Sequence, residues 1–156
     1  MSKNVPSHLE DHLGYWLRCL SNFVSHSFAE RLARLDISVA QWVVLRTLHG
    51  NSGVTLNEAA AQVGVDKSSL SRMVERLVQK GLASRTEGDD RRSVKLALTA
   101  AGKKLVPQLA QLADENDAAF FSTLEPKQRA EFLGMIQQLL TANRWDASQR
   151  GRDRME

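Results

Sequence analysis

Two short helical segments joined by a short glycine turn restrict the fold of this chain more than any other feature. Thr55 stands three residues before Glu58, and this spacing predicts a capping box at the start of a helix. The helix passes through three alanines to Gly64, where glycine permits the positive φ that ends many helices. Asp66 then predicts the N-cap of the next helix. Two helices joined by so short a turn predict a helix-turn-helix.

The second of these helices has two chemically different faces. At about 100° per residue, one face collects the apolar side chains, which are Leu70, Met73, Val74 and Leu77. The opposite face collects hydrogen-bond donors, which are Ser68, Ser69, Arg72 and Arg76. We expect the apolar face to pack against the protein and the polar face to contact another molecule.

Two strand-like runs follow the helix-turn-helix, at residues 82–86 and 93–98. In the second run Val94, Leu96 and Leu98 alternate with smaller or polar residues, as in a half-buried strand. The segment between the runs reads EGDDRR, which is typical of a hairpin tip. A hairpin directly after a helix-turn-helix predicts a wing. The predicted fold class is therefore mainly α with a small β-hairpin wing, a winged helix-turn-helix.

Amphipathic helices are predicted on both sides of this unit. Residues 9–35 carry leucines and aromatic residues at helical spacing, and residues 100–122 and 125–142 do the same. We expect Pro107 to kink or loosen the helix that contains it.

The domain organisation follows from these elements. We expect a single chain whose winged helix-turn-helix lobe occupies residues 39–98, with dimerisation helices at residues 9–35 and 100–142. Residues 144–156 form a polar tail. The lobe is too small to bury all of the apolar stripes on the flanking helices. Pairing of two copies would bury the rest, so we expect a homodimer.

The basic charge is concentrated in the middle of the chain. The net charge is zero over residues 1–65, +5 over residues 66–104 and −2 over residues 105–156. A local basic excess is typical of a surface that binds a polyanion. A solvated basic face is the alternative, and charge by itself does not decide between them.

Several classes of function lack a motif in this sequence. No apolar run approaches the roughly 20 residues of a membrane span, and the N-terminus lacks an apolar signal core. One cysteine, Cys19, excludes an internal disulfide framework and fits a reducing cytoplasm. Four histidines and one cysteine without ligand spacing predict no metal site. With no nucleophile-base motif or glycine-rich phosphate loop, we expect a cytoplasmic protein without a cofactor, an enzymatic activity or a membrane partner.

Two stretches of the chain resemble the MarR family of bacterial transcription regulators. One is the helix DKSSLSRMVERLVQKGL, and the other is the wing DDRRSVKLALTAAG, with Asp90, Arg92, Leu98, Thr99 and Gly102 at the family's spacing. The resemblance covers roughly residues 9–142. It implies a winged helix-turn-helix homodimer that binds pseudo-palindromic, double-stranded operator DNA.

The resemblance assigns the helix at residues 67–80 to the major groove of DNA. Arg72 and Arg76 can each bond guanine O6 and N7 in a bidentate manner. Ser68 and Ser69 suit phosphate oxygens or base edges, and Lys67 suits a phosphate. The alternative for Arg76 is a surface ion pair with Glu75 or another acid.

The wing is predicted to reach the minor groove. Arg91 and Arg92 lie at the hairpin tip, where an arginine can enter a narrow A·T-rich minor groove. By resemblance, Asp90 orients a neighbouring arginine through a salt bridge and does not contact DNA. An ordinary charged turn is the alternative interpretation.

A polar and aromatic face on the first helix is a candidate effector site. The spacing places His12, Tyr15, Cys19, Asn22 and His26 side by side. In the family, small aromatic or phenolic effectors often bind between the first helix and the winged lobe. We therefore expect a small aromatic acid or phenol to bind here, with Arg18 available to a carboxylate from across the dimer. A solvated face is the alternative. The family's peroxide sensors have a cysteine where this chain has Gly14, so we expect no redox role for Cys19.

The sequence therefore predicts a DNA-binding regulator, most simply a repressor that a small ligand releases from its operator. A winged-helix module that binds proteins and no longer binds DNA is the alternative function. Arg72 and Arg92 discriminate between the two, because such a module would not need them.

Overall fold

The computed structural model describes residues 6–88 and 93–145. A 3-10 turn at Leu9–Asp11 precedes six α-helices and three short strands. The helices are α1 (Leu13–Ala33), α2 (Val39–Leu48), α3 (Leu56–Val63), α4 (Lys67–Gln79), α5 (Ala100–Phe121) and α6 (Pro126–Ala142). The strands are β1 (Val54–Thr55), β2 (Ala83–Glu87) and β3 (Val94–Leu98). The predicted fold class, mainly α with a winged helix-turn-helix, is confirmed.

Local side-chain bonds start both helices of the helix-turn-helix. Thr55 Oγ1 accepts from the backbone N–H of Glu58 at 3.2 Å, and Glu58 Oε2 accepts from the N–H of Thr55 at 2.8 Å. Asp66 Oδ1 accepts from the N–H of Ser69 at 2.9 Å and caps α4. Gly64, between the helices, has a φ of 79°. The predicted capping box, glycine turn and second cap are all confirmed.

The wing is part of a three-stranded sheet with the order β1-β3-β2. β2 and β3 are antiparallel, from the Ala83–Leu98 pair to the Glu87–Val94 pair. The predicted strands are confirmed to within one residue at their N-terminal ends and at the C-terminal end of β2. The sequence did not predict β1, whose Val54 pairs with Leu96. Two residues are too few to show an alternating pattern.

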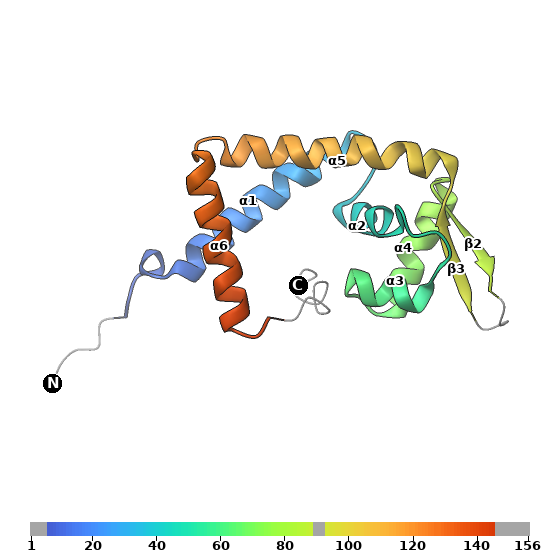
Figure 1. Cartoon of the computed structure of the whole chain (residues 1–156), viewed down its shortest axis with the longest axis horizontal. Helices are drawn as coiled ribbons and strands as arrows, with labels where there is room; N and C mark the ends of the chain where they lie inside the picture. Colours follow the sequence, from blue (N-terminus) through green and yellow to red (C-terminus); the bar gives the residue numbers. More distant parts are fainter. Residues whose placement is uncertain (1–5, 89–92, 146–156) are drawn as a thin grey trace.

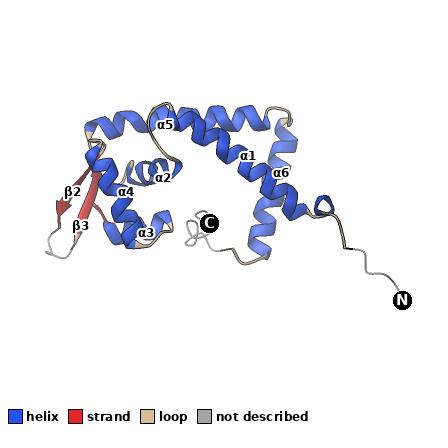
Figure 2. Ribbon diagram, turned by 180° about the vertical axis from the view of Figure 1, so that it is seen from behind, coloured by secondary structure: helices blue, strands red, loops and turns tan. Residues whose placement is uncertain are grey.

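The buried core lies in the winged lobe. Its largest fully buried side chains come from α2, α4, β3, the end of α1 and the first half of α5. They are Leu32, Leu45, Leu70, Leu77, Leu96, Leu109, Val44 and Val74. α2, α3 and α4 therefore form a bundle beneath α5, with the sheet at its outer edge (Figures 1 and 2).

α5 connects the lobe to a separate arm made of α1 and α6 (Figure 1). α1 packs against α5, where the Phe23 and Phe120 rings meet edge to face at 5.2 Å. Asn116 Nδ2 donates to the Val24 carbonyl at 3.2 Å in the same contact. α6 descends from the far end of α5 and has no buried residue. α5 remains one helix through Pro107.

The prediction of one helix from residue 9 is wrong at its start. The 3-10 turn Leu9–Asp11 comes first, and His12 is extended, with φ −104° and ψ 124°. Asp11 Oδ2 accepts from the N–H of His8 at 2.9 Å, and the Trp16 indole donates to the Glu10 carbonyl at 2.9 Å. Such local side-chain bonds compete with helix continuation, so α1 begins only at Leu13.

Candidate nucleic-acid interface

α4 presents the predicted polar face to solvent. Leu70, Val74 and Leu77 are fully buried on its other side. Arg72 and Arg76 are exposed, and neither has a hydrogen-bond or ion-pair partner within residues 6–88 and 93–145. The alternative in which Arg76 pairs with Glu75 is wrong, because the Glu75 carboxylate binds a different arginine of the wing. Both arginines are therefore available to a ligand.

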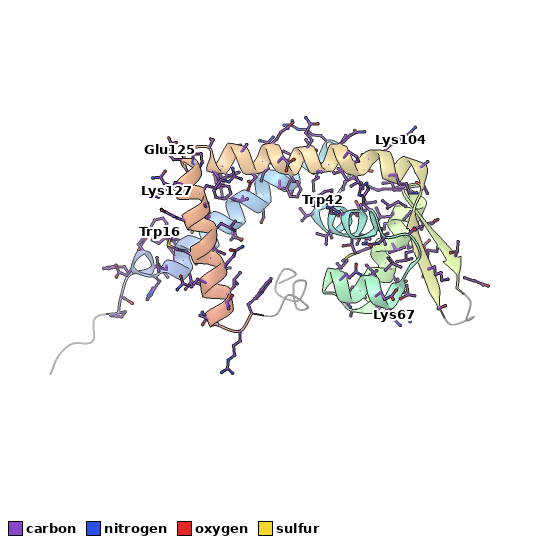
Figure 3. The ribbon with its side chains drawn as sticks, in the orientation of Figure 1. Trp16, Trp42, Lys67, Lys104, Glu125 and Lys127 are labelled. Carbon is purple, nitrogen blue, oxygen red and sulfur yellow. The ribbon has the colours of Figure 1, made fainter. Side chains whose placement is uncertain are left out.

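The start of α4 is organised around the Asp66 carboxylate. Ser69 donates both its hydroxyl, at 2.5 Å, and its backbone N–H to Asp66. These bonds, the hydroxyl first, lower the pKa of Asp66 below its usual range. Ser69 is half-buried and its proton is engaged, so only its oxygen can accept from an incoming group. Ser68 and Lys67 are exposed at the same end of the helix, as Figure 3 shows for Lys67.

The cap of α3 has the same electrostatic character. The backbone N–H of Thr55, and then its hydroxyl, donate to Glu58 and lower the pKa of that carboxyl. The two helices of the helix-turn-helix therefore both begin at ionised carboxylates, which favour the positive end of the helix dipole.

The second motif of the resemblance forms a joint between α4, the wing and α5. Thr99 Oγ1 donates to the Gly81 carbonyl at 2.6 Å and accepts from the N–H of Gly102 at 3.1 Å. The N–H of Thr99 donates to the Leu82 carbonyl at 3.1 Å. A Cβ on Gly102 would overlap that same carbonyl oxygen, so only glycine fits. The joint holds the end of α4 directly on the start of α5.

The predicted wing residues Asp90, Arg91 and Arg92 lie outside the described residues. The described base of the hairpin is closed by the Gly88 N–H, which donates to the Ser93 carbonyl at 2.7 Å. The roles of Arg91 and Arg92 at the minor groove, and of Asp90 in orienting an arginine, therefore stay predictions.

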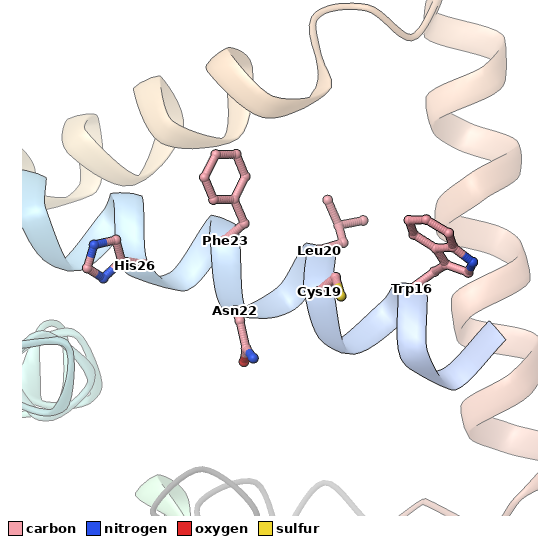
Figure 4. A pocket seen from close by; sticks show the side chains of 6 residues that line it. All are labelled: Trp16, Cys19, Leu20, Asn22, Phe23 and His26. Atoms are coloured by element: carbon pink, nitrogen blue, oxygen red, sulfur yellow. The ribbon is translucent and has the colours of Figure 1, made fainter. Parts of the chain in front are cut away.

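The candidate effector residues do not form one site. A shallow, open groove on α1 is lined by Trp16, Cys19, Leu20, Asn22, Phe23 and His26. In Figure 4, Trp16, Leu20 and Phe23 extend on the side of α5 and α6, whereas Asn22 extends in the opposite direction. Every lining residue comes from α1, so the winged lobe contributes no wall to this groove.

Three of the predicted effector residues, His12, Tyr15 and Arg18, do not line this groove, whereas His26 does. His12 precedes α1 in an extended conformation, which removes it from the helical face on which the prediction placed it. Tyr15 is half-buried and packs edge-on against Trp16, with ring centroids 5.3 Å apart. Arg18 is exposed. His26 lies 3.5 Å from Glu30, one helical turn later.

Within the described residues, no helix is long and apolar enough to cross a membrane. No group of histidine, cysteine, aspartate and glutamate side chains in that part of the chain is arranged to hold a metal ion.

Comparison with known proteins agrees with the fold and the helix-turn-helix. The model of the MarR family matches residues 35–93. The chain is 35% identical over 88 residues to the multiple antibiotic resistance protein MarR of Escherichia coli, across 56% of this chain and 61% of that protein. It superposes on the crystal structure of a mutant MarR from E. coli complexed with operator DNA. That superposition has 28% identity and a TM-score of 0.74, and it covers 82% of this chain and 93% of that one.

These comparisons support a winged-helix regulator of the MarR type.

Two further relatives extend the likeness beyond the lobe. The chain is 25% identical over 141 residues to a putative transcriptional regulatory protein for the hcr operon of Thauera aromatica, across 89% of this chain and 85% of that protein. A structure of Bordetella bronchiseptica BpsR, whose DNA binding is regulated by 6-hydroxynicotinic acid, has the same fold, with 24% identity and a TM-score of 0.75. It covers 86% of this chain and 98% of that one.

Two cations of the winged lobe form ion pairs that the sequence does not predict. Lys80 Nζ lies 2.9 Å from Asp36 Oδ2, which ties the end of α4 to the turn between α1 and α2. Arg85 Nη1 lies 3.3 Å from Glu75 Oε2. Both cations count toward the basic excess of residues 66–104 but are engaged within the protein. No sequence signal marks them, since their partners lie on other elements.

Proposed function

We propose that this protein is a homodimeric, sequence-specific DNA-binding transcription regulator, a repressor that binds double-stranded operator DNA. The observation that supports this most is the pair of arginines, Arg72 and Arg76, which have no partner within the described structure. They lie on a helix whose opposite side buries Leu70, Val74 and Leu77. A helix of this kind fits the major groove, where arginine reads guanine. Lys67 and Ser68 then contact phosphates at the start of the helix, and Arg91 and Arg92 reach the minor groove.

The arm supplies the dimer in this proposal. Large apolar side chains of α1 and α6 are exposed in the protomer, among them Trp16, Phe23 and Leu139. A second copy would cover them, because a two-fold interface brings the same surface together from both chains. Residues 9–35 and 100–142 are then the dimerisation helices, and the two α4 helices lie about one duplex turn apart, roughly 34–36 Å.

Selection of bound sequences from random duplex DNA tests this function. We expect one pseudo-palindromic sequence to be enriched. Arg72→Ala should cost about 1–3 kcal/mol per half-site and relax the preference at one base pair. Arg92→Ala should weaken binding mainly at sites with A·T-rich flanks. If the parent enriches no sequence and both variants bind random duplex as it does, the protein-interaction module becomes the better interpretation.

A matched pair of lysines provides the control for charge. Lys67 lies on the lobe, whereas Lys127 lies on α6 in the arm (Figure 3). Lys67→Ala should weaken binding to all sequences and reduce the salt slope by about 1. Lys127→Ala removes the same charge but should leave the salt slope unchanged.

We further propose that a small aromatic acid or phenol lowers operator affinity by binding at the α1 groove. Asn22 and His26 supply polar groups there beside Trp16 and Phe23. A ligand shifts the dimer only by binding the DNA-incompetent arrangement more tightly, and a typical coupling corresponds to about 5–150-fold in affinity. This groove becomes enclosed only if the second copy supplies the missing wall.

A calorimetric screen of aromatic acids, with and without DNA, tests the effector proposal. His26→Ala should reduce the response and leave ligand-free DNA binding nearly unchanged. Tyr15→Ala, which removes the ring that packs edge-on against the groove residue Trp16, should do the same. Ser25→Ala, an exposed α1 residue outside the groove, is the matched control. Absence of binding at millimolar concentration, or normal responses from both variants, would contradict the proposal.

A further inference from the structure

Arg85, on β2 of the wing, connects the wing to α4. Its Nη1 lies 3.3 Å from Glu75 Oε2, and its Nη2 donates to Ser71 Oγ at 3.4 Å. Arg85 is two residues after the buried Ala83 on β2, so both point to the same face of the sheet. Glu75 and Ser71 are one turn apart on α4 and face the same direction. One guanidinium therefore holds two successive turns of α4 against β2.

The same ion pair also engages Glu75, the acidic residue nearest in sequence to Arg72 and Arg76. Glu75 follows Arg72 by three residues and directly precedes Arg76. On a helix surface, a carboxylate three residues after an arginine is a natural ion-pair partner for it. Because Glu75 is held by Arg85, both Arg72 and Arg76 remain without an ion pair within the described residues.

From these contacts we propose that Arg85 is a positioning residue for DNA recognition. It fixes the rotation of α4 relative to the wing, and its ion pair with Glu75 is part of that attachment. This role rests on the proposed function, since it concerns the affinity and selectivity of DNA binding. Arg85 is 29% exposed and Glu75 52% exposed, so the ion pair contributes little to folding stability.

The direction in which Glu75→Gln changes DNA affinity distinguishes a positioning role of Arg85 from a direct contact of Arg85 with DNA. If Arg85 simply bound a phosphate, Glu75 would be an acid that repels DNA, and Glu75→Gln would strengthen binding. If Arg85 acts by holding α4, Glu75→Gln removes half of the bridge and must weaken binding. The two interpretations therefore predict opposite changes.

The experiment uses the full-length protein and the duplex that the parent enriches most in the selection. Operator affinity, salt slope and single-base preference are measured for Glu75→Gln, Arg85→Gln and the double variant. We expect each single variant to lose about 5- to 30-fold in operator affinity and some base preference. The double variant should bind the operator no less tightly than the single variant with the lower affinity. The salt slope should stay unchanged, whereas loss of a phosphate contact would reduce it by about 1 per half-site.

Three controls complete the design. Glu87→Gln removes an acid from the same strand, two residues from Arg85, and should leave affinity equal to or slightly above that of the parent. Arg85→Lys keeps the charge but cannot bridge two partners as a guanidinium does, so it should restore only part of the affinity. Thermal unfolding of all variants should remain close to that of the parent.

The outcome separates failure of this inference from failure of the function. A parent that enriches no sequence overturns the proposed function. A parent that enriches an operator, with a Glu75→Gln variant that binds it as tightly or more tightly, overturns the positioning role of Arg85.

Discussion

The winged lobe buries its large apolar side chains, whereas the arm leaves most of its own exposed. In the lobe, leucines and valines from four helices and the sheet are fully buried against one another. In the arm, α6 has no buried residue, and α1 buries only Leu32, at its lobe end. Every exposed large apolar side chain among the described residues, except Leu35, lies within residues 9–23 or 133–145. The lobe thus completes its core within one chain, whereas the arm leaves an apolar surface that a second chain would cover.

α5 shows the same contrast along a single helix. Its first half buries Gly102, Val106 and Leu109 in the lobe. Its second half buries only Asn116, whose Oδ1 has no hydrogen-bond partner in the described structure. The difference teaches that the lobe completes its packing within one chain, whereas the far half of α5 and the arm do not.

The largest expected effect comes from removing part of the arm. Deletion of residues 124–156 removes α6, which in the proposed homodimer would help to cover the exposed apolar side chains of α1. We expect aggregation or unfolding, since exposed apolar surface of this extent favours association. Light scattering with circular dichroism measures both. A well-folded monomer that still binds DNA would show that the arm needs no partner.

Leucine truncations test the contrast directly. Leu45→Ala, in the lobe, should cost about 2–5 kcal/mol at any protein concentration, since Leu45 is fully buried within one chain. Leu17→Ala, in the arm, should instead alter how the unfolding midpoint depends on protein concentration. Chemical denaturation at several concentrations separates the two. If Leu17→Ala lowered the free energy of unfolding equally at all protein concentrations, the arm would not differ from the lobe in needing a second chain.

Substitutions of two glycines should have smaller effects on stability, of opposite sign in the lobe and in the arm. Gly102→Ala should destabilise by about 1–3 kcal/mol, because its Cβ would clash with the Leu82 carbonyl oxygen. A Cβ added at Gly134, on α6, would meet no described atom within 4 Å. Gly134→Ala should therefore stabilise the helix by about 0.5–1 kcal/mol. Thermal unfolding of both variants measures this, and a destabilised Gly134→Ala would place the second subunit on that face of α6.

The buried amide of α5 gives the next effect. Asn116→Leu keeps the shape of the side chain and removes a buried oxygen that lacks a partner among the described residues. The loss of the Val24 bond offsets part of the gain, so we expect a stabilisation of about 1 kcal/mol. Asn22→Leu, at an exposed position of α1, is the control. A destabilised Asn116→Leu would mean that the amide oxygen binds a group of the second subunit.

The smallest effect concerns pH. The pKa values of Glu58 and Asp66 are lowered in the folded protein. The two carboxylates therefore contribute to folding stability above their unfolded pKa values, and this contribution is lost as the pH falls through their folded pKa values. Glu58→Gln with Asp66→Asn keeps both caps and removes the titration. The double variant should lose less stability than the parent below about pH 4. Equal acid sensitivity in urea unfolding would contradict the assignment.

Much of the lobe could be predicted because its signals are local. The caps at Thr55 and Asp66 each depend on residues three positions apart, and the buried face of α4 depends on helical periodicity. The start of α1 could not be predicted, since side-chain bonds around Asp11 and Trp16 compete with a continuous apolar pattern. β1 escaped prediction because its partner, β3, lies far along the chain.

The candidate DNA surface divides in the same way. Arg72 and Arg76 were placed on the free face of α4 from spacing alone, and the sequence by itself determined that face. Which cations remain free was decided only by the tertiary structure, where Lys80 pairs with Asp36 and Arg85 with Glu75. The physical reason is that periodicity specifies the direction of a side chain on its own helix. An ion pair between elements depends on the distance between them, which only packing sets.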